Sequence, residues 1–380
     1  MCILIRAFML ATLLLASIFS HAQNSSLDSE IVKLMADNHI PGLAACAIDS
    51  GKITWTGYYG YQNILKKIPV IESTLFAVAS TSKTITSAAL MKLYDEGRFK
   101  MDEDVNKFLP FKVENPIYPG TPITFGELLR HRSSIKDNED YLGQFWDSNH
   151  GDPTIPLAIF LKNYLSPGGK NYNGKKNFYE EKPDSAFHYC NVGIALVGYL
   201  VECISGMPFD QFCKQRLFVP LEMNHTAWFL KDLDPERIAM PTSYSGSLKQ
   251  YINLGYGGYP DYPAGEMRTS VTEFAHFLIA WTQDGNFNGR QIFNKSAIQK
   301  LTPVDFNLGF YTWFLFPTEK GQIIYTHTGG DIGVRAFIGF SPRTKRGIII
   351  LMNGVIDNND QFKKLINLVY DNAGLSGKSN

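Results

Sequence analysis

Cysteine is scarce in this sequence, with five residues among 380. Cys2 lies at the extreme N-terminus, and the other four lie in apolar or helical contexts rather than at the regular spacings of a small disulfide-bonded domain: Cys46, Cys190, Cys203 and Cys213. Cys203 and Cys213 are near enough in sequence to form a disulfide, but buried free thiols are the favoured interpretation. The scarcity argues against a disulfide scaffold and does not support redox chemistry.

The sequence also lacks an excess of charge of either sign. Lys and Arg together number 36, as do Asp and Glu, so the formal net charge is zero. Loss of Arg6 with an N-terminal leader would remove one basic side chain and leave 35 against 36 acidic ones. A chain with balanced charge has no broad field to attract nucleic acid or an anionic membrane, so neither is expected as a partner.

Two motifs of common hydrolases are missing. The eight histidines show no His-Glu-x-x-His or comparable ligand spacing, which argues against a metallohydrolase. No Gly-x-Ser-x-Gly segment occurs, which argues against an α/β-hydrolase. The sequence also contains no internal repeat and no low-complexity tract.

A long apolar run occurs only at the N-terminus. Arg6 precedes an apolar stretch over residues 7–19, which is too short to span a bilayer, and Ser20-His21-Ala22 offers small residues for cleavage. We predict a signal peptide over residues 1–22 and an exported mature chain, periplasmic or secreted. Because the basic part holds a single arginine, an uncleaved anchor is the alternative. No cysteine lies at the cleavage point, where the next residue is Gln23, which argues against a lipoprotein.

The strand-like and helical patterns in the sequence indicate an α/β (α+β) fold. Strand-like runs lie near both ends of the chain, and a helical pattern over residues 361–371 closes it. The runs cover residues 43–48, 53–59, 322–326, 335–340 and 347–352. Their positions predict one antiparallel sheet that is built from the N- and C-terminal segments and flanked by helices.

The middle of the chain has a different pattern. Helical periodicity with few strand-like alternations covers residues 125–131, 156–164, 190–205, 208–217 and 271–282. We expect an inserted all-helical lobe over about residues 81–299 and an α/β lobe made of about residues 23–80 and 300–375. The two lobes would form a single domain over residues 23–375.

Ser80-Thr81-Ser82-Lys83 opens a segment that is predicted to be helical over residues 81–94. A serine at a helix N-terminus lies at the positive end of the helix dipole, and a lysine three residues later projects from the same face. Partial burial lowers the pKa of a lysine toward values at which it can take the serine proton. Ser80 is therefore a candidate nucleophile and Lys83 its base. For an isolated Ser-x-x-Lys, the alternative is a helix cap followed by a solvated lysine.

A second cluster, Tyr189-Cys190-Asn191, lies immediately before a predicted helix. A tyrosine beside Lys83 can relay protons to a leaving group, and Asn191 can hydrogen-bond a substrate amide or hold Lys83 in place. Taken alone, these residues are better interpreted as an aromatic core position and a helix cap.

A third cluster, His327-Thr328-Gly329-Gly330, ends a predicted strand near the C-terminus. Small residues let a substrate backbone lie against the strand edge, and a free backbone amide there can donate to a developing oxyanion. A strand that ends in a Gly-Gly turn is the ordinary alternative.

Together and in this order, the three clusters resemble the three motifs of the serine β-lactamase and penicillin-binding protein superfamily. The similarity is strongest with its class C-like branch, which includes D-alanyl-D-alanine carboxypeptidases, D-aminopeptidases and esterases. Supporting similarity covers almost the whole mature chain, through Leu128-Leu129-Arg130-His131, Pro220-Leu221-Glu222-Met223, Pro263-Ala264-Gly265 and Leu308-Gly309. The resemblance implies a β-lactamase-like fold.

The resemblance also implies a role for each motif position. Ser80 would attack a carbonyl to form an acyl-enzyme, while Lys83 and Tyr189 would share the general-base and general-acid roles. The backbone N–H groups of Ser80 and Gly330 would form the oxyanion hole. The rest of the substrate-binding region would comprise Asn191, His327, Thr328 and Gly329. Water would then release the acyl group, with no metal and no cofactor.

The chain departs from the family pattern at His327, where many β-lactamases of this kind carry lysine. Histidine is only partly charged near neutral pH, so an anchor for a substrate carboxylate is weaker here. Histidine at this place is also familiar in carboxypeptidase-like and esterase-like relatives. Arg335 could supply a carboxylate contact instead, although an exposed arginine at a strand end is the favoured interpretation.

Two further departures lie next to the motifs. Glu266 follows Pro263-Ala264-Gly265, where the family often has glycine; it could attract a substrate amine, but a solvated carboxylate is favoured. Cys190 stands where serine is common and could alter the hydrogen bonding near Lys83.

The leading hypothesis is an exported serine hydrolase that acts on an ester or amide bond of a small molecule or peptide, with a D-amino-acid peptide as one candidate. The alternatives are a penicillin-binding receptor, a non-catalytic scaffold of the same fold, and a true β-lactamase. The sequence does not name the acyl group or the oligomeric state.

Overall fold

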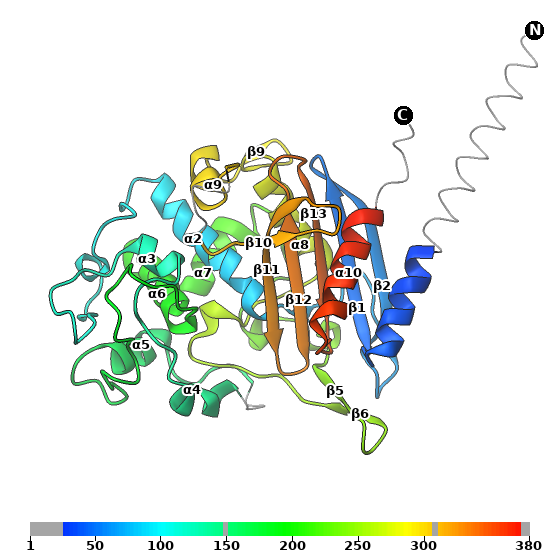
Figure 1. Ribbon diagram of the computed structural model, residues 1–380, viewed down its shortest axis with the longest axis horizontal. Coiled ribbons are helices and arrows are strands. Elements are labelled where there is room, and N and C mark those ends of the chain that lie inside the picture. The colour runs from blue at the N-terminus through cyan, green and yellow to red at the C-terminus, as the bar shows by residue number, and fades with distance from the viewer. Residues whose placement is uncertain (1–25, 147–150, 306–310, 374–380) are drawn as a thin grey trace, which may run out of the picture.

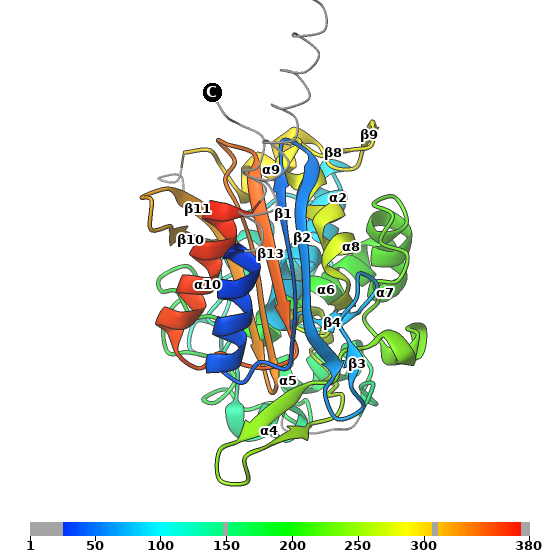
Figure 2. The ribbon, with the colours of Figure 1, turned by 90° about the vertical axis from the view of Figure 1, so that its right-hand side faces the viewer.

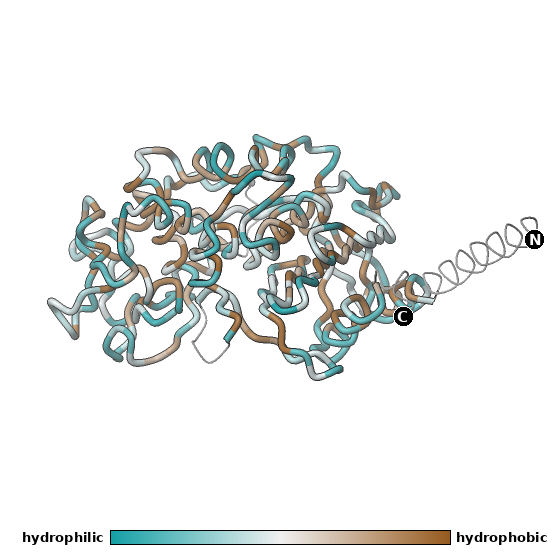
Figure 3. Tube along the Cα trace, turned by 90° about the horizontal axis from the view of Figure 1, so that it is seen from above, coloured by the Kyte–Doolittle hydropathy of each residue, from teal (hydrophilic) through white to brown (hydrophobic). Residues whose placement is uncertain are grey.

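The computed structural model describes residues 26–146, 151–305 and 311–373. The predicted signal peptide and the Leu308-Gly309 segment lie outside this part of the chain. Within it, a lobe built on a β-sheet lies beside a mostly helical lobe (Figure 1). Seen from above, hydrophilic stretches follow much of the outline of both lobes (Figure 3).

One antiparallel sheet organises the first lobe, with seven strands in the order β10-β11-β12-β13-β1-β2-β3. Their bounds are β1 Gly42–Asp49, β2 Lys52–Asn63, β3 Ile68–Pro69, β10 Phe314–Pro317, β11 Ile323–Asp331, β12 Val334–Phe340 and β13 Arg346–Met352. β1 joins the two ends of the chain, because it pairs with β2 on one side and with β13 on the other, where Cys46 lies opposite Ile349. The predicted sheet built from both terminal segments is confirmed.

β1 separates two apolar cores. Successive side chains of a strand point to opposite faces of the sheet. Leu43, Ala45 and Ala47 pack in the core under the terminal helices, whereas Cys46 and Ile48 pack in the core that continues into the helical lobe. Burial on both faces explains why this strand reads as a continuous apolar run.

Two helices from opposite ends of the chain cover one face of the sheet. A helix over residues 26–37 and α10 (Asn359–Asn372) lie side by side there (Figure 2). Leu27 and Ile31, which recur at helical spacing, are buried in the same core as Phe362 of α10. The side chain of Asn358 caps α10 by accepting the N–H groups at the start of the helix.

The helical lobe contains most of the predicted helices, with α2 and α6 packed together at its centre. Their bounds are α2 Ser82–Asp95, α3 Phe125–Leu129, α4 Glu139–Trp146, α5 Leu157–Leu165, α6 Asn191–Ser205, α7 Phe209–Cys213 with a π-helical continuation over Lys214–Phe218, and α9 Lys295–Leu301. α6 ends at Gly206 because this residue adopts the left-handed conformation, at φ 75°, that terminates many helices.

α8 (Val271–Thr282) differs from the predicted division into lobes. It lies within the range predicted for the helical lobe, yet it packs against β1 and β13, on the sheet face opposite α10. The Tyr58 hydroxyl of β2 lies 3.3 Å from the Thr272 hydroxyl. A helix that is apolar around most of its surface can be buried in either lobe, so its sequence pattern alone does not assign it.

Short elements complete the described structure. The remaining strands are β4 Phe76–Ala77, β5 Thr242–Ser245, β6 Gln250–Asn253, β7 Arg268–Thr269, β8 Asn286–Phe287 and β9 Arg290–Gln291. The 3₁₀ turns are Ala79–Thr81, Val105–Lys107, Leu230–Asp232, Pro235–Arg237 and Tyr262–Ala264.

The four cysteines of the described chain are all free thiols, as predicted. Over the same residues, no single helix has the length and apolar character needed to cross a membrane. The bent pair Asn191–Ser205 and Phe209–Phe218, whose axes differ by 78°, reaches that length and composition only when the two helices are taken together.

Candidate active site

Ser80 lies in the middle of the 3₁₀ turn Ala79–Thr81, directly before α2. Ala79 has φ 44°, in the left-handed region that costs a residue with a Cβ atom about 1 kcal/mol or more. The Val78 N–H donates to the Met267 carbonyl at 3.0 Å and ties the turn to the short strand β7. The candidate nucleophile therefore lies on a tight turn that is fixed from outside.

Lys83 lies one helical turn after Ser80, and its side chain is completely buried. Its Nζ atom donates to the Ser80 Oγ at 3.0 Å and to the Ala264 carbonyl at 2.6 Å. The same nitrogen lies 5.0 Å from the centre of the Tyr189 ring. The structure therefore brings together the three residues to which the sequence assigned the proton transfers.

The Tyr189-Cys190-Asn191 segment is held by an aspartate from a neighbouring loop. The Asp137 carboxylate accepts the backbone N–H of Asn191 at 2.8 Å and that of Val192 at 3.0 Å. A carboxylate at this end of α6 is favoured by the helix dipole. This cap fixes the position of Asn191, which lines the same pocket as Ser80.

Cys190 belongs to the helix cap. Its Sγ atom accepts the Gly193 N–H at 3.2 Å and lies 3.1 Å from the Asp137 carboxylate. The sequence suggested an effect on hydrogen bonds near Lys83, but the bonds of this thiol go to the start of α6.

β11 places the third cluster against the turn that contains Ser80. His327 and Gly329 are buried, whereas Thr328 and Gly330 are exposed. A Cβ atom on Gly329 would lie 2.3 Å from the Val78 carbonyl oxygen, so only glycine allows this approach. Gly330 lines the pocket that contains Ser80, which is where the resemblance puts the second oxyanion donor.

His327 is a buried neutral imidazole. Burial, followed by the charge of Lys83, lowers its pKa to about 3. Its Nδ1–H donates to the Thr328 carbonyl at 2.7 Å. The prediction of a partly charged histidine is therefore wrong, because desolvation disfavours the imidazolium.

Arg335 does not replace the missing cation. Its guanidinium lies 4.5 Å from the centre of the Phe362 ring, on α10. This helix covers the sheet face away from Lys83 and the helical lobe. Arg335 is half-buried by this contact rather than exposed.

The prediction that Glu266 is a solvated carboxylate is wrong. It is 3 % exposed, and one of its oxygens accepts the Tyr259 N–H. Burial raises the pKa of this carboxyl well above its usual value, although Arg268 partly offsets the effect. The tertiary structure places Glu266 in the wall of a pocket beside Tyr259 and Arg268.

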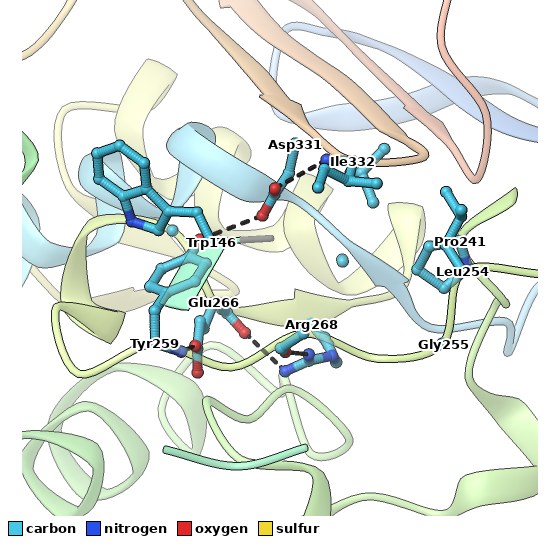
Figure 4. A pocket seen from close by; sticks show the side chains of 13 residues that line it. Trp146, Pro241, Leu254, Gly255, Tyr259, Glu266, Arg268, Asp331 and Ile332 are labelled. Carbon is cyan, nitrogen blue, oxygen red and sulfur yellow. Dashed lines mark hydrogen bonds between the residues drawn. The ribbon is translucent and has the colours of Figure 1, made fainter. Parts of the chain in front are cut away.

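The cleft also contains residues from outside the three motifs. One pocket is lined by Ser80, Asn191 and Gly330 together with Trp146, Tyr259, Asp261 and Asp331. Burial, with the charge of Asp137, raises the pKa of Asp261 to about 7. A second pocket shares Trp146, Tyr259 and Asp331 with the first and extends to Glu266 and Arg268 (Figure 4). Tyr259 belongs to an aromatic loop over residues 255–260, and Asp331 directly follows Gly330, whereas Trp146 and Asp261 had no signal in the sequence.

Comparison with known proteins identifies the family. The family described as Beta-lactamase matches residues 27–369. The chain belongs to the beta-lactamase family. This family membership agrees with the superfamily resemblance that the three motifs indicated.

Curated relatives of this beta-lactamase family member are distant. Protein flp of Staphylococcus aureus (strain MRSA252) is 24% identical over 333 residues, which cover 86% of this chain and 62% of the relative. Penicillin-binding protein 4* of Bacillus subtilis (strain 168) is 26% identical over 318 residues, which cover 79% of this chain and 65% of the relative. The chain thus spans less than two thirds of the length of these relatives.

Solved structures share the fold. The octameric penicillin-binding protein homologue from Pyrococcus abyssi has a TM-score of 0.74 at 25% identity, covering 91% of this chain and 76% of its own. The D-amino acid amidase from Ochrobactrum anthropi SV3, complexed with L-phenylalanine amide, has a TM-score of 0.72 at 17% identity. The match covers 92% of this chain and 99% of the amidase chain. The fold is therefore that of β-lactamases and penicillin-binding proteins.

The burial of His327 predicts that the free energy of unfolding depends on pH. A histidine whose pKa falls on folding stabilises the protein above its unfolded pKa near 6.5, and this contribution is lost as the pH falls toward the folded value of about 3. Between pH 7 and pH 5, the wild type should therefore lose about 2 kcal/mol of unfolding free energy that His327→Gln does not lose. Denaturant unfolding at both pH values measures this difference. His276→Gln, which removes a half-buried imidazole from α8, is the control, and an equal loss in wild type and His327→Gln would contradict the prediction.

Proposed function

We propose that this protein is an exported serine hydrolase that forms an acyl-enzyme on Ser80 and hydrolyses an ester or amide bond. Its substrate is a small molecule or peptide, with a D-amino-acid peptide as one candidate. The observation that carries the proposal is the 3.0 Å contact between the Ser80 Oγ and the buried Lys83 Nζ. A buried amine against a serine hydroxyl provides a base next to a nucleophile.

The reaction proceeds in two halves. The Ser80 Oγ attacks the substrate carbonyl and loses its proton to the Lys83 and Tyr189 pair, while the backbone N–H groups of Ser80 and Gly330 stabilise the oxyanion. The same pair returns a proton to the departing amine or alcohol. Water then attacks the acyl-enzyme, and the acid product leaves with Ser80 regenerated. The chemistry uses no metal and no cofactor.

The neutral imidazole of His327 favours esters and ordinary amides over β-lactams. A β-lactam carries a carboxylate next to its reactive ring, and a fixed positive charge in the third motif helps to hold it. His327 does not provide that charge at neutral pH, since its pKa lies at about 3. True β-lactamase activity is therefore the weaker alternative.

Export is proposed from the leader over residues 1–22. A mature chain that begins at Gln23, as measured by intact mass after expression with the native leader, supports cleavage. Retention of the full leader supports the uncleaved anchor instead.

One experiment separates the candidate functions. Purified protein is mixed with p-nitrophenyl acetate, and in parallel with benzylpenicillin, and its intact mass is recorded beside that of Ser80→Ala. Turnover of the ester that depends on Ser80 supports a hydrolase. A persistent penicillin adduct without ester turnover favours a penicillin-binding receptor, and rapid loss of the drug favours a β-lactamase. No turnover and no adduct would favour a scaffold.

A further inference from the structure

A side chamber opens from the cleft beside Ser80. It is lined by Trp146, Tyr259, Glu266, Arg268 and Asp331. Trp146, Tyr259 and Asp331 also line the pocket that contains Ser80, so the two spaces adjoin. In Figure 4, the rings of Trp146 and Tyr259 stand together on one side of the chamber, and the Asp331 carboxylate points toward them.

Two carboxyl groups of the chamber are only partly satisfied. Glu266 accepts the Tyr259 N–H with one oxygen, while its buried second oxygen has no hydrogen-bond partner among the described residues. Asp331 accepts the Ile332 N–H at 2.8 Å with Oδ1, and its Oδ2 lies 3.5 Å from the Tyr259 hydroxyl. A buried carboxyl with an unused oxygen is costly unless a ligand completes it.

Arg268 does not complete these carboxyl groups. Its Nη1 donates to the Trp228 carbonyl at 3.3 Å and to the Glu266 carbonyl at 3.1 Å, and its Nη2 donates to the Gly257 carbonyl at 2.8 Å. These bonds direct the guanidinium donors to backbone oxygens. Arg268 lowers the pKa values of Glu266 and Asp331, yet burial raises both above their usual range on balance.

We propose that the side chamber binds a primary ammonium group of the substrate, with the Asp331 and Glu266 carboxyl groups as its acceptors and the Trp146 and Tyr259 rings as its walls. A bound ammonium group donates hydrogen bonds to both carboxyl groups and favours their ionised forms, and aromatic faces attract an organic cation. This inference rests on the proposed function, and it defines the substrate class as aminoacyl amides, esters or peptides with a free amine.

The adjacent positions of Gly330 and Asp331 suit such a substrate. Asp331 directly follows Gly330, the proposed oxyanion donor, so the two residues lie at adjacent positions of β11. A carbonyl seated at Ser80 therefore leaves the ammonium group only a few bonds away, as in an amino-acid amide. An N-acylated substrate has no such charge and gains nothing from the chamber.

A matched pair of substrates tests the proposal. The free-amine p-nitroanilides of D- and L-phenylalanine are compared with their N-acetyl forms. We expect kcat/KM to be at least about tenfold higher for a free-amine form. Asp331→Asn should lower this value by about 10- to 100-fold, mainly through KM, because it removes the charge but keeps an oxygen for the Ile332 N–H. The same variant should lower kcat/KM for the N-acetyl substrates at least about fivefold less than for the free-amine forms, so that the preference for the free amine narrows.

The control is Asp284→Asn. Asp284 pairs with Lys295 at 3.1 Å on the surface and lies outside both pockets. Its replacement should therefore leave kcat/KM unchanged for both the free-amine and the N-acetyl substrates. Equal or better turnover of the N-acetyl forms by the wild type would overturn the proposal, and so would an equal loss on both substrates in Asp331→Asn. Preference for an N-succinyl form would instead assign the chamber to a carboxylate that binds Arg268.

A binding measurement keeps this proposal separate from the proposed hydrolysis. Calorimetry with the Ser80→Ala protein compares D- and L-phenylalanine amide with their N-acetyl forms. Tighter binding of a free-amine form by about tenfold or more, without any turnover by the wild type, would support the chamber and contradict the hydrolase. Turnover that depends on Ser80, together with equal binding of both forms, would support the hydrolase and contradict the ammonium site in the chamber.

Discussion

Replacing Ser80 by alanine is expected to reduce hydrolysis of every substrate by at least about 10⁴-fold. The substitution removes the oxygen that forms the acyl-enzyme, and the other hydroxyl of the turn, on buried Thr81, donates to the Val78 carbonyl at 2.8 Å. The fold should remain, since the Lys83 amine still donates to the Ala264 carbonyl. Steady-state turnover of an activated ester and the intact mass of the reacted protein measure the effect.

Ser82→Ala is the matched control for this experiment. Ser82 lies two residues after Ser80, at the start of α2, and its hydroxyl accepts the Met267 N–H at 3.2 Å. Its loss should cost about 1 kcal/mol of stability and leave turnover within a few-fold. Retained activity in Ser80→Ala would end the acyl-enzyme account, and so would an adduct mapped to a different residue.

Replacing Lys83 by methionine is expected to lower kcat/KM by about 10³-fold or more, with the protein still folded. Methionine keeps the length and apolar stem of the side chain but removes the amine that lies 3.0 Å from the Ser80 Oγ. Removal of a buried polar group also removes its desolvation cost, which offsets the lost bond to Ala264. The melting temperature should therefore change little while the activity falls, and both are measured on the same preparations.

Lys92→Met is the control on the same helix. The Lys92 amine donates to the Ile292 carbonyl, outside the two pockets of the cleft. We expect this variant to keep its activity within a few-fold. An activity of Lys83→Met within tenfold of the wild type would assign the base to Tyr189 alone.

The strands of the sheet and the individual motifs were predictable because each depends on residues that are close in sequence. β1 and β13 show apolar runs typical of strands buried on both faces, and Ser80 and Lys83 share one face of a helix by their spacing alone. α8 shows the limit of such patterns. Its apolar surface predicts burial, but only its contacts with β1 and β13 assign it to the sheet.

The sequence by itself determined the superfamily, the sheet built from both ends of the chain, and the positions of Ser80, Lys83 and Tyr189. Only the tertiary structure decided which polar groups are buried. The sequence predicted a solvated carboxylate at Glu266 and a partly charged imidazole at His327, yet both side chains are buried. Burial sets the protonation of a side chain, and it depends on contacts between distant segments that local patterns do not record. The side chamber between Trp146, Tyr259 and Asp331 could not be predicted either, because segments that are distant in the sequence form it.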